Sequence, residues 1–328
     1  MDIKFSIQSG GNVDFSPGFS ILGADFAKMS LELERQATRT NEVQFTFDVL
    51  QGDPISGFNN KEYYHLRDSL IKKAPGGICA YFPDQDYTDS NKINILTTPP
   101  VADQRGFSAC VAYSVCYTTL STILKRGSGG YNSSNIYSPD FIYARMTDKS
   151  CGGLQLPPVL DFIVANGDCT TADVPLQDTA DCKKYDSTMR KKVRASIGKA
   201  LAIHDQLKMG WVPLDPNDID QIRLVLQNGE PVIAAFYISS SFMDMWSYPN
   251  PLYPGKNVWK SLSGPYTDSH CVAIVGYDNG VKMFKVQNSW GTSNSAGDGF
   301  FWVTYDLVQR GCFSEAYSFM RNPDLTPK

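Results

Sequence analysis

The sequence predicts an α+β fold in two lobes, a helical lobe at about residues 100–205 and a β-rich, barrel-like lobe at about residues 206–315. In the first part, apolar residues recur at the three- and four-residue spacing of amphipathic helices. In the second part, short apolar runs bounded by Gly, Pro and Asn dominate, as expected of strands. The chain has 328 residues, a length that suits two domains or one large two-lobed domain.

The overall composition is that of an ordinary globular protein, with 42% hydrophobic and 20% charged residues. A net charge of −4 provides no electrostatic attraction for nucleic acid or for an anionic membrane, so we expect neither as a partner. No apolar run is long enough to span a bilayer. The eight cysteines show neither the density of a disulfide scaffold nor the spacing of a zinc site, so no metal or other cofactor is predicted.

Residues 1–92 form an N-terminal extension ahead of a main domain at residues 93–328. Within the extension we expect a helix at residues 25–39, a strand at 43–49 and a second helix at 60–73. The extension therefore has enough amphipathic structure to fold against another surface.

The polar, turn-like residues 84–91 are the predicted boundary between the extension and the main domain. Residues 1–5 lack the apolar core of an export signal. We therefore expect a cytoplasmic protein, or one delivered by a non-classical route, in preference to a lysosomal or secreted one.

A helix predicted to begin at Ser108 carries a candidate nucleophile. Ser108 is a good N-cap residue, and Gly127 would end the helix. Cys110 would lie in the first turn, where unpaired N–H groups and the helix dipole favour a thiolate over a thiol. Gln104 lies just upstream on a non-helical approach, so its amide can reach the sulfur. A nucleophile at a helix N-terminus beside an amide donor is an arrangement for acyl transfer.

Further helices are predicted from helical periodicity and from capping residues. They start at residue 138 and cover residues 158–165, 189–201 and 218–228. Between the first two lie Gly152 and Gly153, a pair that suits a strand edge which another backbone must approach closely.

The β-rich lobe is predicted from runs of apolar residues that are too short for helices. Residues 231–238 form a buried strand, and residues 242–265, rich in Trp, Tyr, Pro and Gly, are expected to be a long loop. A further strand is expected at residues 300–305.

Two more strands are predicted at residues 269–277 and 284–291, joined by a turn at 278–280. This prediction places His270 and Asn288 at strand ends. The other two histidines of the chain are expected inside amphipathic helices, so His270 is the candidate base.

These segments resemble the papain family of cysteine peptidases over roughly the last two-thirds of the chain. The residues that carry the resemblance are Gln104, Cys110, His270 and Asn288 in that order, with the run Cys-x-Ala-Tyr-Ser, the apolar strand after the histidine and the motif Asn-Ser-Trp-Gly. The resemblance implies an active site in the cleft between the two lobes, a peptide or protein substrate, and no cofactor.

The resemblance also implies a role for each of these residues. Cys110 and His270 would form a thiolate–imidazolium pair that attacks a peptide carbonyl and yields an acyl-enzyme. Asn288 would orient the imidazole, and Trp290 would shield their hydrogen bond from water. Gln104 and the backbone N–H of Cys110 would form the oxyanion hole.

The same resemblance implies residues for substrate binding. Gly152 and Gly153 match the glycine pair that lines the cleft, and Gly153 would pair with the substrate backbone. Leu154, Leu156 and Cys271 are expected to wall the pocket for the second residue before the scissile bond. An apolar residue there would be preferred by about 1–3 kcal/mol over a smaller one.

The chain departs from the family at a disulfide. Phe107 stands where the family usually has a cysteine, and the partner position falls at Ser150, so both halves of the bridge are absent. This departure favours a reducing compartment, and we expect most of the cysteines to be thiols. A bridge between Cys169 and Cys182 remains an open alternative.

Two other functions are compatible with the same motifs. One is a peptide ligase or acyltransferase that uses the same thioester, and the other is a silent relative that only binds peptides. The four intact residues argue against a protein that only binds peptides, and an asparagine at position 288 favours hydrolysis over transglutaminase chemistry.

For residues 1–92 we hypothesise intramolecular inhibition, as in a zymogen. Because the family's propeptide pattern is missing from them, a structural extension or a partner-binding surface is the alternative.

Overall fold

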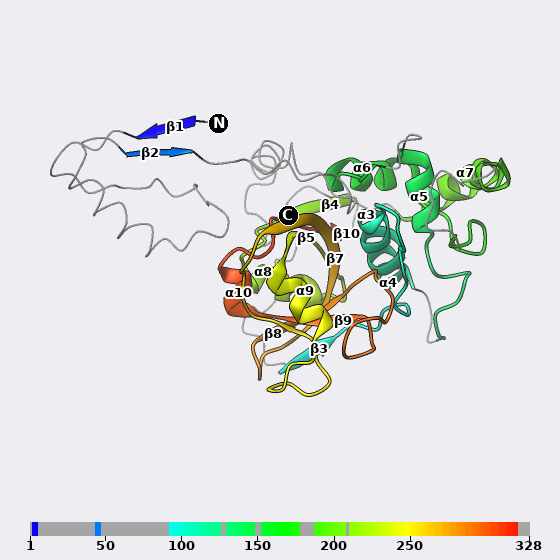
Figure 1. Ribbon diagram of the computed structural model, residues 1–328. Coiled ribbons are helices and arrows are strands. Elements are labelled where there is room, and N and C mark those ends of the chain that lie inside the picture. Colours follow the sequence, from blue (N-terminus) through cyan, green and yellow to red (C-terminus); the bar gives the residue numbers. More distant parts are fainter. Residues whose placement is uncertain are drawn as a thin grey trace, which may run out of the picture. The chain divides into compact units, whose positions relative to one another are not determined.

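A computed structural model describes residues 2–5, 43–46, 92–125, 129–147, 152–177, 187–207 and 210–320 (Figure 1). The chain divides into two compact units, Met1–Asp53 and Pro54–Lys328. In the first unit, strands β1 (Asp2–Phe5) and β2 (Val43–Thr46) pair antiparallel, with Ile3 opposite Phe45. Strand β2 lies within the strand predicted at residues 43–49. The helices predicted at 25–39 and 60–73 and the boundary predicted at 84–91 lie outside the described residues.

The second unit is built on an eight-stranded sheet that curves around an apolar interior (Figure 1). The strand order is β4-β10-β5-β7-β8-β9-β6, and β3 pairs with β7 beside that path. All these pairs are antiparallel except β6 with β9. The strands are β3 Ile93–Ile95, β4 Gly210–Leu214, β5 Val232–Ser239, β6 Val258–Trp259, β7 Tyr266–Asp278, β8 Met283–Gln287, β9 Phe300–Thr304 and β10 Glu315–Met320.

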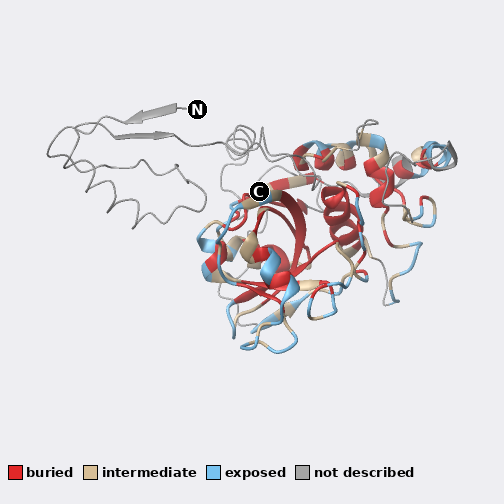
Figure 2. Cartoon of the chain, in the orientation of Figure 1, coloured by how far each residue is buried: buried red, intermediate tan, exposed pale blue. Residues whose placement is uncertain are grey.

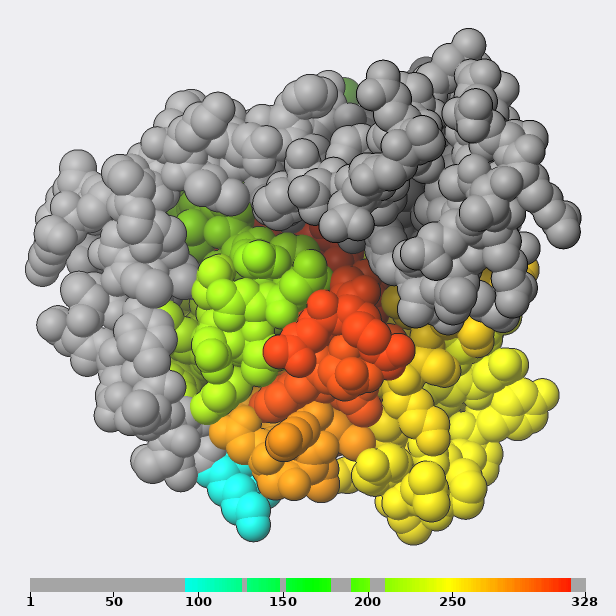
Figure 3. All heavy atoms as spheres, turned by 90° about the vertical axis from the view of Figure 1, so that its left-hand side faces the viewer, coloured from blue at the N-terminus to red at the C-terminus, as the bar shows by residue number. Residues whose placement is uncertain are grey.

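Helices lie on both sides of this sheet (Figure 1). The first is continuous and consists of α3 Cys110–Ala112, a π-helical stretch Tyr113–Leu120 and α4 Ser121–Leu124. The others are α5 Pro139–Met146, α6 Leu156–Asn166, α7 Ser187–Leu207, α8 Ile219–Gln227, α9 Ser240–Ser247 and α10 Tyr305–Gln309. Figure 3 shows the face on which α8 (yellow-green) and α10 (red-orange) lie side by side. Among the described residues, no helix is both long and apolar enough to cross a membrane.

Local sequence explains several of the helix ends. The side chain of Ser138 accepts a hydrogen bond from the N–H of Phe141, and that of Asp218 accepts from the N–H groups of Asp220 and Gln221. Gly167 ends α6 with a positive φ of 70°. These helices start or stop within two residues of the predicted positions.

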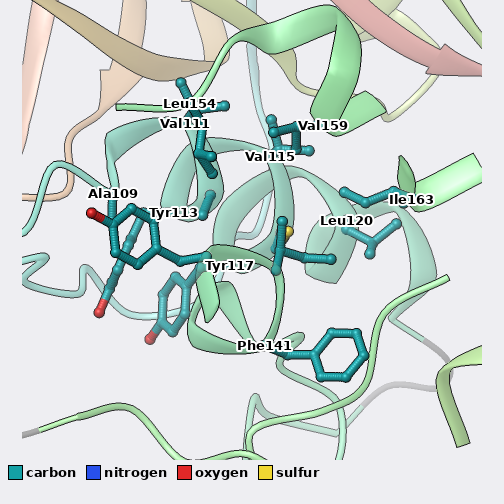
Figure 4. Packing of buried hydrophobic residues seen from close by; sticks show 14 of the residues in the cluster. Ala109, Val111, Tyr113, Val115, Tyr117, Leu120, Phe141, Leu154, Val159 and Ile163 are labelled. Atoms are coloured by element: carbon teal, nitrogen blue, oxygen red, sulfur yellow. The ribbon is translucent and has the colours of Figure 1, made fainter. Parts of the chain in front are cut away.

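The N-cap predicted at Ser108 is wrong. The helix begins at Cys110, Ala109 is the residue before it, and no side chain caps it. Every residue from Cys110 to Ser121 is buried, so this helix is enclosed by the protein on all sides and has no solvent-facing side. Figure 4 shows Val115 of this helix in the same apolar cluster as Val159 of α6. Tertiary packing therefore sets the start of this helix.

Both faces of strand β5 are buried, which explains its uninterrupted apolar sequence. Ile233 and Ala235 belong to the cluster shared with the helical lobe, whereas Ala234 and Phe236 belong to the interior of the curved sheet. Figure 2 shows this buried sheet in red. The sheet thus separates two cores, and one of them contains the start of the Cys110 helix.

Two predictions for the β-rich lobe need correction. Residues 242–265 are not one loop, because they contain most of α9 and the whole of β6. Ser239 caps α9, and the helix buries Phe242, Met245 and Trp246 at helical spacing. The sheet also includes β3, which precedes the predicted lobe of about 206–315, and its strand β10 ends at Met320, a few residues beyond it.

Candidate active site

His270 and Asn288 come together through the pairing of β7 with β8. In this antiparallel pair Ala273 lies opposite Gln287, and Asn288 follows β8 directly. The imidazole Nε2 is 2.7 Å from Asn288 Oδ1. His270 lies four residues inside β7, not at its end as predicted. Its Nδ1 is buried and has no hydrogen-bond partner among the described residues.

Cys110 begins α3, which packs against β7. Its side chain is completely buried, and burial raises the pKa of the thiol to about 12. A hydrogen bond from the backbone of Cys271 and one from the backbone of Val111, in the first helical turn, act in the opposite direction. The sulfur therefore lies beside the residue that follows His270.

Burial also disfavours the charged form of the imidazole. It lowers the pKa of His270 to about 4, while the hydrogen bond to Asn288 opposes this shift. A lone thiolate and a lone imidazolium are thus both disfavoured in this closed state. The thiolate expected at Cys110 from its helix position alone is opposed by desolvation. A proton moving from Cys110 to His270 would instead create two charges that stabilise each other.

Gln104 is held from both sides of the site. Its backbone N–H donates to Ser289 O at 2.7 Å, and its Oε1 accepts from Ser289 Oγ at 2.5 Å. Its Nε2 donates to Phe107 O at 2.7 Å. The backbones of Asp103 and Trp290 pair with each other as a single antiparallel β-bridge. The segment before the Cys110 helix is therefore attached to the loop that follows Asn288.

Trp290 covers the histidine. The Trp290 and His270 rings are 4.5 Å apart at 32°, and Phe242 and Trp246 of α9 meet the indole edge-on at 5.9 and 5.5 Å. Aromatic pairs of this kind are stabilising and exclude water. Helix α9, which sequence reasoning missed, thus contacts the ring that packs on His270.

Of the residues predicted to bind substrate, Leu154, Leu156 and Cys271 belong to the same apolar cluster as Cys110. Gly152 and Gly153 are half-buried in an irregular segment before α6, not in a strand. The chain turns directly from them into α6, whose first residue is the fully buried Leu156. Leu154 and Cys271 are buried as well.

Phe107, which stands where the resemblance leads one to expect a cysteine, contributes packing. Its ring stacks on Tyr143 with centroids 6.0 Å apart and planes 14° from parallel. The Tyr143 hydroxyl donates to Gly152 O at 3.3 Å. These contacts tie the segment before Cys110 to the glycine pair without a covalent bond. Ser150 lies outside the described residues.

The described cysteines are thiols. None of them is in a disulfide, and they are Cys110, Cys116, Cys169, Cys271 and Cys312. A bridge between Cys169 and Cys182 is therefore absent. No group of three or more His, Cys, Asp or Glu side chains within the described ranges could hold a metal ion.

Glu315 is a buried carboxyl close to the site that sequence reasoning missed. In the register of the sheet it lies opposite Ala235, which lies opposite Cys271. It is 1% exposed, and its Oε2 accepts a hydrogen bond from the Tyr317 hydroxyl at 3.1 Å. Burial raises its pKa to about 8. The signal for it was a single acidic residue within an apolar run.

Glu315→Gln should change how stability depends on pH. The folded protein keeps the Glu315 proton up to about pH 8, whereas the unfolded chain releases it near its ordinary pKa of 4.5. The wild-type free energy of unfolding should therefore fall relative to that of the variant by up to about 1.4 kcal/mol per pH unit in this window. His270 acts with the opposite sign between pH 4 and 6.5, but equally in both proteins. Urea unfolding at pH 5, 6.5 and 8 measures the difference, and parallel curves would contradict the prediction.

Comparisons with known proteins agree with the fold and assign a family. The sequence profile of the family described as Papain family cysteine protease matches residues 85–319, well over half of the chain. Among solved structures, the chain is similar to xylellain, a cysteine protease from Xylella fastidiosa, with 19% identity, a TM-score of 0.52, and coverage of 72% of this chain and 88% of that one.

Two further structures are similar at lower scores. The clostridial cysteine protease Cwp84 has 17% identity and a TM-score of 0.48, with coverage of 70% of this chain and 56% of that chain. Procathepsin B S9 from Trypanosoma congolense has 17% identity and a TM-score of 0.47, with coverage of 86% and 82%. No curated protein matches the chain. The family match extends across both lobes of the two-lobed fold, and the chain therefore belongs to the papain family of cysteine proteases.

Proposed function

We propose that this protease hydrolyses peptide bonds through Cys110 and His270, with a covalent acyl-enzyme intermediate. The observation that carries the proposal is the 2.7 Å contact between His270 Nε2 and Asn288 Oδ1. It commits one ring nitrogen to Asn288 and leaves Nδ1 for the nucleophile. The Cys110 sulfur, hydrogen-bonded to the backbone of Cys271, lies beside the same stretch of β7.

The reaction begins when the thiol proton passes from Cys110 Sγ to His270 Nδ1. The sulfur then forms a bond to the substrate carbonyl carbon, and the π electrons of the carbonyl move to its oxygen. When the tetrahedral intermediate collapses, the C–N bond breaks and the imidazolium protonates the leaving amine. A water molecule, deprotonated by the imidazole, cleaves the thioester, and the returning proton regenerates the thiol. Asn288 keeps the ring oriented throughout, and Trp290 shields this contact.

Gln104 is proposed to stabilise the oxyanion together with the backbone N–H of Cys110. Only one of the two Nε2 hydrogens is donated to Phe107 O, so the second is available for the substrate oxygen. Gln104→Ala should lower kcat by about 10²–10³-fold with little change in KM, since the lost interaction forms only in the transition state. Steady-state kinetics on a fluorogenic peptide measure this. A kcat within threefold of wild type would remove Gln104 from the mechanism.

For substrate recognition we propose that Gly153 pairs with the substrate backbone and that Leu154 and Cys271 border the pocket for the second residue before the scissile bond. Both side chains are apolar in character and buried beside the start of the Cys110 helix. An apolar substrate residue is expected there.

Incubating the protein with a peptide library and identifying the products by mass spectrometry tests the proposed reaction. Hydrolysis gives new termini that incorporate ¹⁸O from labelled water, because water cleaves the thioester. Products joined at new peptide bonds would instead assign ligase activity to the same thioester. An unchanged library would assign peptide binding without catalysis.

We also propose that residues 1–92 restrain the peptidase. Cys110 and His270 are completely buried in the full chain, which supports a low activity of this form. The full chain and a chain that begins at residue 91 should be compared on one fluorogenic peptide, with residues 1–90 then added back. Higher activity of the shorter chain, and its inhibition by the added segment, are expected. Equal activity without inhibition would leave the extension without a regulatory role.

A further inference from the structure

Two buried asparagines, Asn257 and Asn294, form a polar link close to the loop that follows Trp290. The Nδ2 atom of Asn294 donates to Asn257 Oδ1 at 2.9 Å. Their exposures are 5% and 0%, respectively, so the contact is shielded from water. Asn257 directly precedes β6, and Asn294 lies in the loop between Trp290 and β9. Burying an amide is costly unless its donors and acceptors are paired, so the partners of both side chains are informative.

The Asn294 amide organises the turn ahead of β9. Its Oδ1 accepts hydrogen bonds from the N–H groups of Asp298 and Gly299, at 3.0 and 2.8 Å. Its Nδ2 also donates to Phe300 O and to Asp298 Oδ1, both at 2.9 Å. The carbonyl of Gly299 in turn accepts from the N–H of Asn288 at 3.2 Å. Asn294 therefore holds the residue to which the backbone of Asn288 is attached.

The Asn257 amide holds the last turn of α9. Its Nδ2 donates to Met245 O and Trp246 O, at 2.5 and 3.1 Å, and these are carbonyls of the kind that a helix leaves unpaired at its C-terminal end. Its Oδ1 accepts from the N–H of Ala296 at 2.9 Å, in the same loop as Asn294. The ring of Trp246 meets that of Trp290 edge-on, with centroids 5.5 Å apart. Asn257 therefore ties the helix that contacts Trp290 to this loop.

The neighbours determine the orientation of both amides. A backbone carbonyl can only accept, so the Asn257 atom that faces Met245 O must be Nδ2. A backbone N–H can only donate, so the Asn294 atom that faces Asp298 N and Gly299 N must be Oδ1. Asn294 is thus the donor and Asn257 the acceptor in the contact between them. Neither amide can flip without losing several hydrogen bonds.

We propose that Asn257 and Asn294 are positioning residues for the imidazole of His270. Asn294 acts on Asn288 through the turn ahead of β9, and Asn257 acts on Trp290 through α9. Neither asparagine is expected to touch substrate. The proposal rests on the role of His270 in proton transfer described above. A group that both accepts and delivers a proton depends on a fixed ring orientation, which its supporting residues provide.

Kinetics of Asn294→Ala and Asn257→Ala in the full chain test the proposal. In each variant we expect kcat to fall about tenfold and KM to stay within twofold, because the ring orientation matters in the chemical steps and not in substrate binding. The two variants disturb different contacts, one in the turn ahead of β9 and one at the end of α9. The proposal therefore stays testable if one of them does not fold.

Asn94→Ala is the matched control. The Asn94 amide also joins two segments, since its Nδ2 donates to Leu226 O at 3.1 Å and links β3 to the end of α8. The control removes a partly buried amide contact of the same kind away from His270. It should lower the free energy of unfolding in urea and leave kcat unchanged.

Alkylation of Cys110 by iodoacetamide separates positioning from general loss of stability. A displaced imidazole stabilises the Cys110 thiolate less, so the midpoint of the pH profile of alkylation should move to higher pH in Asn294→Ala and Asn257→Ala. The profile of Asn94→Ala should match that of the wild type. A double-mutant cycle adds a second criterion: in an Asn288→Ala background, Asn294→Ala should change kcat by less than twofold.

Three results would overturn the proposal. A wild-type kcat in either alanine variant would remove that asparagine from the positioning of His270. An unchanged alkylation profile, or a full tenfold loss from Asn294→Ala that persists in the Asn288→Ala background, would show a structural role only. Failure of the proposed function is distinguishable from all three, because a wild-type kcat in His270→Ala would show it directly.

Discussion

Replacing Cys110 with alanine is expected to lower kcat by about 10⁶-fold, the effect of removing a nucleophile from a group of residues that act as a unit. The remaining Gln104, His270 and Asn288 cannot form an acyl-enzyme. The fold should persist, because the change removes one small buried atom from a helix that is packed on all sides. Turnover of a fluorogenic peptide and thermal unfolding measure the two effects.

Labelling with a peptide-like thiol-reactive inhibitor provides an independent measurement. The wild-type chain should gain one adduct at Cys110, and Cys110→Ala should gain none. Cys312→Ala is the matched control, since it removes another buried thiol, in the second core and away from the site. It should retain both turnover and labelling. Turnover that survives in Cys110→Ala would exclude the proposed mechanism.

Gly299→Ala should lower the free energy of unfolding by about 2–5 kcal/mol, from backbone strain and overpacking together. Gly299 has a φ of +74°, and a Cβ there would lie 2.5 Å from both Gly291 O and Val101 Cγ1. The backbone cannot easily yield, because the Gly299 N–H donates to Asn294 Oδ1 at 2.8 Å and its carbonyl accepts from Asn288 N at 3.2 Å. The substitution should therefore also shift Asn288 and lower kcat.

Gly297→Ala separates the two sources of this loss. Gly297 has the same φ of +74°, but a Cβ at this position would meet no atom within 4 Å. It should lose only about 1–2 kcal/mol, the cost of an L-residue in a left-handed conformation. Chemical denaturation of both variants gives the comparison. Equal losses at the two glycines would show that the contacts of Gly299 contribute nothing.

The sequence alone predicted the elements whose pattern is local. The two strands around His270 and Asn288 were predicted because alternating and apolar runs bounded by Asp278 and Gly280 are strong strand and turn signals. Their ends were less accurate: β7 starts at Tyr266 and β8 already stops at Gln287, four residues before the predicted end. Helix α8 was placed to within a residue because Asp218 caps it. Helix α9 was missed because nearby prolines and glycines outweighed the spacing of Phe242 and Trp246.

In the candidate site, too, some features were predicted from the sequence and others were visible only in the structure. The resemblance of the motifs to the papain family predicted that Gln104, Cys110, His270 and Asn288 form the site, and the family match covers the segments that hold them. Only the tertiary structure showed that Asn288 Oδ1 contacts His270 Nε2. It also showed that burial disfavours a thiolate at Cys110 and an imidazolium at His270 when either forms without the other. Contacts such as the one from Ser289 to Gln104 join segments 185 residues apart. Desolvation and pairing over such distances depend on how the lobes pack, which no local pattern of residues encodes.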